Sequence, residues 1–314
     1  MDIYYPKDEI FGVENLRQYV AKLKGTVTKT AQKLIGKKIL ENMDPTPIPI
    51  QTGPEIKEGS FGWVYTKATY KGKRVTVKRL KYAEQPSTFL LEAIVQCIMH
   101  NYTKQTMCPI QVPEVYRFGK ANFSQWVYRN RESRMEKVQS YVIVMEHIEG
   151  KPLHQVENIK PHINTIVHGL QHIQDDMAFV HRDFHAYNII VSNKLYMIDF
   201  GRTCVGLNSK TIYDKYEWYT TKCNNRSHDV CTLIVNLVTS YDKQELRAVA
   251  AQICKQYKDK VKDSPYQEYD MNIDYSGQQW KDRIFHWHYI GYLEEVELEP
   301  YVPKNMLSIW KLKF

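Results

Sequence analysis

Two short stretches in the second half of the chain carry side chains that could do chemistry. The first reads HRDFHAYN, residues 181–188, and Asp199-Phe200-Gly201 begins eleven residues after its last member. A phosphoryl-transfer site needs a carboxylate to orient the acceptor hydroxyl. It also needs an oxygen ligand and a second carboxylate to hold Mg²⁺ on the nucleotide phosphates. Asp183, Asn188 and Asp199 are the required residue types, in loops flanked by β-forming residues.

The first half of the chain contains residues suited to phosphate binding. Residues 56–65 read IKEGSFGWVY, and Gly59 and Gly62 would let backbone amides approach phosphate oxygens. By itself a Gly-x-x-Gly pair is weak evidence for phosphate binding, because most such glycines are turn residues. Sixteen residues after Gly62 comes Lys78 in the strand-like VTVK, and Glu92 follows fourteen residues later. That spacing can place Glu92 opposite Lys78, where an ion pair would aim the ammonium at phosphates.

The elements that must position these residues change in type along the chain. Residues 55–80 alternate as an antiparallel sheet does, with a glycine turn at 71–73, and residues 88–101 have helical periodicity. Residues 112–118 and 140–145 are strand-like, and the basic stretch between them, with Arg129, Arg131, Arg134 and Lys137, predicts a loop. Helical patterns then dominate, apart from short β segments around Ile189 and Tyr196. This order predicts an α+β protein in two lobes.

Taken together, the motifs resemble the signature set of the eukaryotic-type protein kinase superfamily. The resemblance covers roughly residues 55–240 and five elements in order: GSFGWVY, VTVK, the helix glutamate, HRDFHAYN and IDFG. It implies a bilobed kinase-like fold with an N-lobe at 55–148 and a C-lobe at 149–314. The N-lobe would be small and β-rich with one main helix, and the C-lobe larger and helical. The compact divergent sequence also resembles kinases of large DNA viruses.

The resemblance implies ATP and Mg²⁺ as cofactors and gives each motif a role. Asp183 would be the catalytic base, while Asn188 and Asp199 would hold Mg²⁺. Lys78 would contact the α- and β-phosphates and pair with Glu92. The implied nucleotide-binding residues are Ile56, Gly59, Ser60, Phe61, Gly62, Val64, Lys78, Glu146 and Ile148. Within this set Val64 would pack on the adenine and backbone groups of Glu146 and Ile148 would meet its edge, with Met145 guarding the back pocket.

Several positions depart from the superfamily pattern. Lys57 replaces the first glycine of the glycine-rich loop, Thr76 replaces the usual alanine near the adenine, and Gln96 stands where an apolar residue is expected. Only thirty residues separate Asp199 from Asp229, which resembles the aspartate that opens the large C-lobe helix. No Ala-Pro-Glu lies between them. The resemblance therefore implies a shortened activation segment.

The acceptor is ambiguous from the sequence. His185 stands where serine/threonine kinases commonly carry lysine, and the D-x-H-x-x-N form resembles aminoglycoside and choline-type kinases. His181-Arg182 is protein-kinase-like, and Arg182 could receive a phosphate. Its candidate acceptors are Thr203, Ser209, Thr211 and Tyr213. The leading hypothesis is a serine/threonine protein kinase acting on an unidentified protein. The alternatives are a small-molecule kinase and a non-catalytic scaffold with a kinase-like fold.

Composition fits a globular intracellular protein. The 314 residues are 43% hydrophobic and 25% charged, with a net charge of +8. No secretory signal begins the sequence, so the six cysteines are expected to be reduced in a cytoplasmic protein. Cys223, His228 and Cys231 lack a fourth ligand at standard spacing, which disfavours a zinc site. No nucleic-acid signature is visible.

Residues 1–54 differ from the rest of the chain. Residues 16–43 have apolar positions at helical spacing, six lysines on a basic face, and Gly25 as a break between two helices. The prolines at 45, 47 and 49 then mark a boundary. A basic amphipathic segment of this kind could dock on an anionic membrane surface or a partner. Packing of its apolar face on the following lobe is the interpretation we favour.

Overall fold

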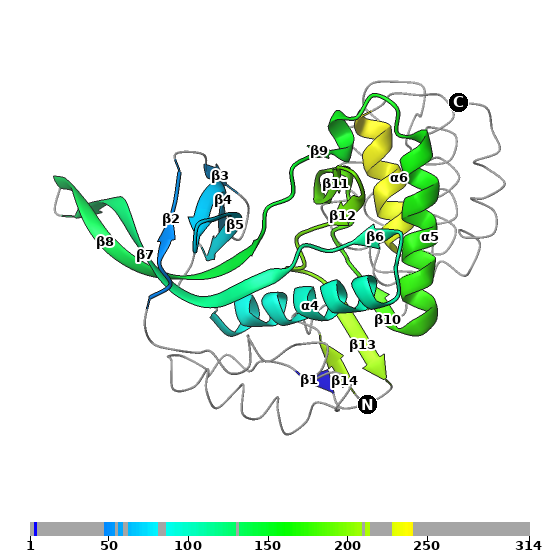
Figure 1. The fold of residues 1–314 in the computed structure, drawn as a ribbon, viewed down its shortest axis with the longest axis horizontal. Helices are drawn as coiled ribbons and strands as arrows, with labels where there is room; N and C mark the ends of the chain where they lie inside the picture. Colours follow the sequence, from blue (N-terminus) through cyan, green and yellow to red (C-terminus); the bar gives the residue numbers. More distant parts are fainter. Residues whose placement is uncertain are drawn as a thin grey trace, which may run out of the picture. The chain divides into compact units, whose positions relative to one another are not determined.

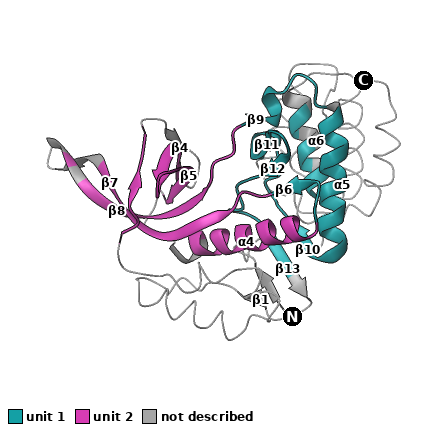
Figure 2. Ribbon diagram, in the orientation of Figure 1, with its two compact units in different colours: residues 1–5, 107–111, 150–314 teal, residues 6–106, 112–149 magenta. Residues whose placement is uncertain are grey.

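The computed structural model describes residues 3–4, 47–53, 56–58, 62–80, 86–129, 132–208, 211–213 and 228–240. These residues form an α+β protein, as predicted, and divide into two compact units (Figure 2). One unit contains the described residues from 47 to 106 and Val112–Glu149, and we call it the sheet unit. The other contains Ile3–Tyr4, Met107–Gln111 and the described residues from Gly150 onward, and we call it the loop unit. The predicted helices of residues 16–43 lie outside the described residues.

The sheet unit is built on a six-stranded antiparallel sheet (Figure 1). Its strands are β2 (Ile50–Gln51), β3 (Ile56–Glu58), β4 (Gly62–Tyr70), β5 (Lys73–Leu80), β7 (Val115–Arg129) and β8 (Glu132–Glu146). The main path runs β2-β4-β5-β8-β7, and β3 pairs with β4. Lys71 and Gly72 both have positive φ between β4 and β5, which confirms the predicted turn. Val75, Val77, Val142 and Val144 form much of the core on one face.

The predicted loop between the last two strands is wrong. β7 and β8 are each 15 residues long and pair continuously from Arg117 to Glu132, through the basic stretch (Figure 1). The alternation that signals a strand is present: Ala121 and Phe123 are buried, whereas Asn122 and Ser124 are exposed. The loop was predicted from the basic residues, but charged side chains are compatible with the strands of a long hairpin.

The helix α4 (Pro86–Gln105) supports this sheet and extends the predicted helix at both ends. Every residue from Phe89 to Met99 is buried, including the polar Glu92 and Gln96. Phe89 packs on Phe118 of β7 with ring centroids 6.0 Å apart. A helix buried on all sides shows little amphipathic patterning, and polar residues in it must find partners.

The loop unit combines helices with two small sheets. The helices are α5 (Lys160–Asp176), α6 (His228–Ser240) and the short 3₁₀ turns η1 (Leu153–Gln155) and η2 (Ala186–Asn188). One sheet has the order β6-β12-β11-β9 and the other β1-β14-β13-β10. Their strands are β6 (Ile110–Gln111), β9 (Lys151–Pro152), β11 (Ile189–Val191), β12 (Leu195–Met197), β1 (Ile3–Tyr4), β10 (Ala178–Val180), β13 (Cys204–Asn208) and β14 (Thr211–Tyr213). The predicted β segments at Ile189 and Tyr196 are confirmed. None of the described helices has the length and apolar character needed to cross a membrane.

The described cysteines differ in state. Cys97 and Cys108 are free and buried, and burial raises the pKa of both thiols, that of Cys108 to about 11. Both side chains are therefore poor nucleophiles at neutral pH. Cys204 is disulfide-bonded, so the prediction of reduced thiols is wrong for this residue.

We predict that Gly150→Ala destabilises the protein. A Cβ at Gly150 would overlap the carbonyl oxygen of Val191 and lie 2.8 Å from Ile190 Cγ2. Because backbone cannot move aside cheaply, the free energy of unfolding should fall by about 1–3 kcal/mol. Gly72→Asn is the control, since Gly72 has nothing within 4 Å and Asn tolerates its positive φ. Urea denaturation measures both, and equal stability of the two variants would contradict the prediction.

Candidate functional site

A buried ion pair links the sheet to α4. Lys78 Nζ on β5 lies 2.6 Å from Glu92 Oε1 on α4, and their side chains are 9% and 2% exposed. The pairing predicted from the fourteen-residue spacing is thus present. Two charges this deep are tolerated because each compensates the other. Their roles toward a nucleotide stay predictions.

The strand register places further predicted residues beside Lys78. Val64 on β4 is the direct cross-strand partner of Lys78, so both side chains lie on one face of the sheet. On the other side of β5, Thr76 is opposite Met145 of β8. Thr76 Oγ1 lies 3.1 Å from His147 Nδ1. The hydroxyl that departs from the superfamily pattern therefore has a protein partner.

The predicted adenine-edge residues lie where β8 ends. The Glu146 N–H donates to Glu114 O at 2.8 Å, and the Glu114 N–H donates to Glu146 Oε2 at 3.1 Å. The Glu146 amide is therefore engaged within the protein, and its role toward an adenine stays a prediction. Ile148 follows in a half-buried segment.

Only part of the glycine-rich motif is described. Ile56 lies in β3 opposite Tyr65, and Lys57, the residue in place of the first glycine, is opposite Val64. Gly62 begins β4, where a Cβ would overlap the Arg79 carbonyl oxygen, so this position requires glycine. The predicted phosphate-binding residues Gly59, Ser60 and Phe61 lie outside the described residues.

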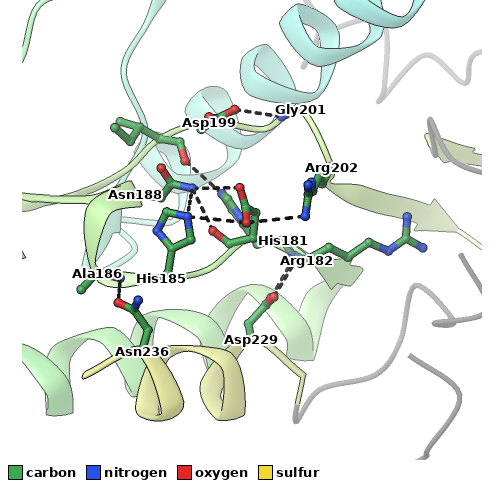
Figure 3. Close-up of polar contacts among 12 residues, drawn as sticks. His181, Arg182, His185, Ala186, Asn188, Asp199, Gly201, Arg202, Asp229 and Asn236 are labelled. Atoms are coloured by element: carbon green, nitrogen blue, oxygen red, sulfur yellow. Dashed lines mark hydrogen bonds and ion pairs between the residues drawn. The ribbon is translucent and has the colours of Figure 1, made fainter. Parts of the chain in front are cut away.

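In the loop unit, residues 181–188 hold Asp183 and Asn188 together. Asn188 Nδ2 donates to Asp183 O at 2.9 Å and to Asp183 Oδ2 at 3.3 Å. His185 Nε2 lies 3.6 Å from Asp183 Oδ1, and Arg202 Nη1 lies 3.9 Å from the same oxygen (Figure 3). The half-buried carboxylate of Asp183 therefore lies close to the Asn188 amide, the His185 ring and the Arg202 guanidinium.

Asp199 is connected to this loop through the backbone. The Ile198 N–H donates to Asn188 O at 3.0 Å, which brings the segment preceding Asp199 against Asn188. Asp199 has φ 66°, a left-handed conformation that aspartate adopts more readily than most residues. Its Oδ1 accepts from the Gly201 N–H at 3.4 Å (Figure 3).

The donor set of Asn188 and Asp199 fits Mg²⁺. Because Asn188 Nδ2 donates to Asp183, its Oδ1 is the amide atom directed to other partners. Mg²⁺ prefers such oxygen ligands and usually takes few from the protein, the rest coming from water and substrate phosphates. Within the described part of the chain, no group of three His, Cys, Asp or Glu side chains could hold a metal ion.

Side chains of helix α6 bind the backbone amides of the loop formed by residues 181–188. Asp229 Oδ2 accepts from the His181 N–H at 2.8 Å and Asp229 Oδ1 from the Arg182 N–H at 3.0 Å. Two helical turns later, Asn236 Oδ1 accepts from the Ala186 N–H at 2.9 Å (Figure 3). Sequence analysis identified Asp229 but missed Asn236 and Arg202. For Asn236 the available signal was a polar residue seven positions after Asp229, on the same helical face.

The predicted phosphate-receiving role of Arg182 meets an obstacle. Arg182 is 4% exposed and has φ 64°, and Thr203 is 2% exposed. Thr203 Oγ1 donates to His181 O at 3.4 Å. A phosphate on Thr203 would need extensive rearrangement, so this candidate is disfavoured. Ser209 lies outside the described residues.

His181 sits beneath the loop as a neutral side chain. Burial lowers its pKa, more than the nearby Asp229, Asp183 and Asp199 carboxylates raise it. The ring packs against Phe184 and Phe200 with centroids 5.5 and 5.3 Å away, and its Nε2 lies 3.1 Å from Ile198 O. Since a carbonyl can only accept, Nε2 carries the proton.

Comparisons with known proteins give one family match. A model of the RIO domain, an atypical protein kinase family, matches residues 134–208, which include HRDFHAYN and IDFG. This supports a kinase-like superfamily for that part of the chain. No curated protein matches.

Among solved structures, the chain is similar to the Rio2 kinase–ADP/Mg²⁺–phosphoaspartate complex from Chaetomium thermophilum. The match has 13% identity and a TM-score of 0.31, and it covers 61% of this chain and 53% of that chain. Such similarity is too low to transfer function.

We predict that His181 makes the protein less stable as the pH falls. Because burial lowers its folded pKa below the unfolded value of about 6.5, the unfolded state binds more protons as the pH falls below that value. The free energy of unfolding then decreases, by at most about 1.4 kcal/mol per pH unit from this residue. Denaturant titrations between pH 7.5 and 5 should give a shallower slope for His181→Phe than for the wild type. Parallel slopes would show that His181 does not contribute.

Proposed function

We propose that this chain is an ATP- and Mg²⁺-dependent protein kinase that phosphorylates serine or threonine hydroxyls. The observation that carries the proposal is the hydrogen-bonded arrangement of Asp183 and Asn188, with Asp199 joined to it through the Ile198–Asn188 backbone bond. The RIO-domain similarity of residues 134–208 agrees with it. The buried Lys78–Glu92 pair supplies the cation that the same chemistry requires.

Each residue has a role in the proposed transfer. Asp183 accepts the proton of the acceptor hydroxyl while the hydroxyl oxygen bonds to the γ-phosphorus. The bond between the γ-phosphorus and the β–γ bridging oxygen breaks, which releases ADP. Lys78, oriented by Glu92, binds the α- and β-phosphates. Asn188 and Asp199 would hold Mg²⁺, which when bound would neutralise charge on the phosphates. Glycines 59 and 62 would cover the phosphates, and Val64 would pack on the adenine.

A small-molecule kinase is the second candidate. The observation that favours it is His185, which lies 3.6 Å from Asp183 in the position where protein kinases commonly carry lysine. Radiolabelled ATP supplied with a protein mixture, and separately with amino-alcohols and aminoglycosides, distinguishes the two. Transfer to neither acceptor class, with no ATP hydrolysis, would favour the scaffold hypothesis. The docking role of the basic N-terminal segment and the viral resemblance remain predictions.

Asp183→Asn should reduce turnover by at least about a hundredfold while leaving ATP affinity nearly intact. The amide cannot accept the hydroxyl proton, and positioned general bases contribute about 10²–10⁴-fold. Its oxygen can still accept from Asn188, so the loop should keep its structure. Single-turnover transfer and nucleotide titration measure the two effects. The exposed Asp176→Asn on α5 is the charge-matched control, and wild-type turnover in Asp183→Asn would disprove the assignment.

Asp199→Asn should raise the Mg²⁺ concentration needed for half-maximal activity by at least about tenfold. Asparagine also tolerates the positive φ at this position, so the variant isolates the loss of charge. Mg²⁺ titrations at saturating ATP test this. The same Mg²⁺ dependence in variant and wild type would exclude Asp199 as a ligand.

A further inference from the structure

Three polar side chains form a line along one face of α4. Glu92, Gln96 and His100 follow one another at intervals of four residues, which places them on the same helical face. We call these three residues the polar ladder. They belong to a helix whose residues from Phe89 to Met99 are all buried, so polar groups here require specific partners.

Each member of the polar ladder bonds to a different part of the sheet unit. Glu92 pairs with Lys78 on β5. Gln96 is 2% exposed, and its Nε2 donates to Pro113 O at 3.1 Å and to Met145 Sδ on β8 at 3.5 Å. His100 Nδ1 donates to Val112 O at 2.7 Å. The helix is therefore joined to β5, to β8 and to the segment that leads into β7.

The segment that receives two of these bonds is itself fixed. Val112 and Pro113 directly precede Glu114, whose backbone N–H and carbonyl both bond to Glu146 at the end of β8. Any axial slip or rotation of α4 would thus break hydrogen bonds to carbonyls that cannot follow it. Breaking them would leave buried donors and acceptors without partners, which is costly.

We propose that Gln96 and His100 are positioning residues that hold α4 in the one register in which Glu92 keeps its ion pair with Lys78. The apolar residue expected at position 96 would fill the same space but would restrain the axial position of the helix less strictly, since it forms no hydrogen bond to a fixed backbone atom. The two side chains act through Glu92 and do not touch substrate. This inference rests on the proposed function for its catalytic consequence and on the structure alone for the register of α4.

The test compares Gln96→Leu with Gln105→Leu, the same substitution at an exposed position of the same helix. Hydrogen exchange followed by mass spectrometry reports the protection of α4 amides, and phosphoryl transfer reports kcat and the acceptor KM. For Gln96→Leu we expect at least about tenfold faster exchange in α4 and at least about tenfold lower kcat. The acceptor KM should stay near wild type, and Gln105→Leu should match the wild type throughout.

Each result decides the proposal. Wild-type exchange in α4 of Gln96→Leu overturns it, whatever happens to kcat, and so does faster exchange with an unchanged kcat. If Gln96→Leu fails to fold, His100→Leu is measured in the same way, and wild-type exchange and kcat there overturn the proposal. If the wild-type protein transfers no phosphate, the proposed function fails. The exchange comparison then still tests whether the polar ladder fixes the register of α4.

Discussion

The buried pair of Lys78 and Glu92 is the constraint on which the sheet unit depends. Removing either partner would leave an uncompensated charge among side chains that are almost fully buried, a cost of about 3–5 kcal/mol. The pair can form only if α4 packs on β5 in one register, and β4 and β8 pair with β5 on either side. The same strand pairing sets Val64 opposite Lys78 and Met145 opposite Thr76.

A comparable constraint operates in the loop unit through the backbone. Arg182 has a positive φ, which costs about 1–3 kcal/mol for a residue other than glycine. The Asp229 carboxylate offsets that cost by accepting from two successive amides at charge-assisted distances. Asn236 accepts from a third amide of the same loop. The orientation of Asp183 thus originates in side chains some fifty positions later in the chain.

Sequence reasoning succeeded where the chemistry is local and failed where it depends on contacts across the fold. The fourteen-residue spacing from Lys78 to Glu92 made their pairing possible, and the resemblance to the kinase signature predicted the pair that the structure contains. Asn236 was missed although it lies on the same helical face as Asp229, because a helix pattern does not show which polar residue accepts from a distant amide. The strands β10, β13 and β14 were missed because strands of three to five residues are defined mainly by the strands they pair with.

The buried polar residues in both units have the same physical effect. Gln96, His181 and Asn236 each occupy a place that an apolar side chain could fill, and each donates to or accepts from a backbone group. These side chain–backbone hydrogen bonds contribute little net stability, because water would have satisfied the same groups in the unfolded chain. Their effect is directional: a hydrogen bond to a fixed backbone atom selects one position, whereas apolar packing accepts several. Within each unit, the proposed phosphoryl transfer would depend on that selection more than on additional stability, because functional groups must be held accurately.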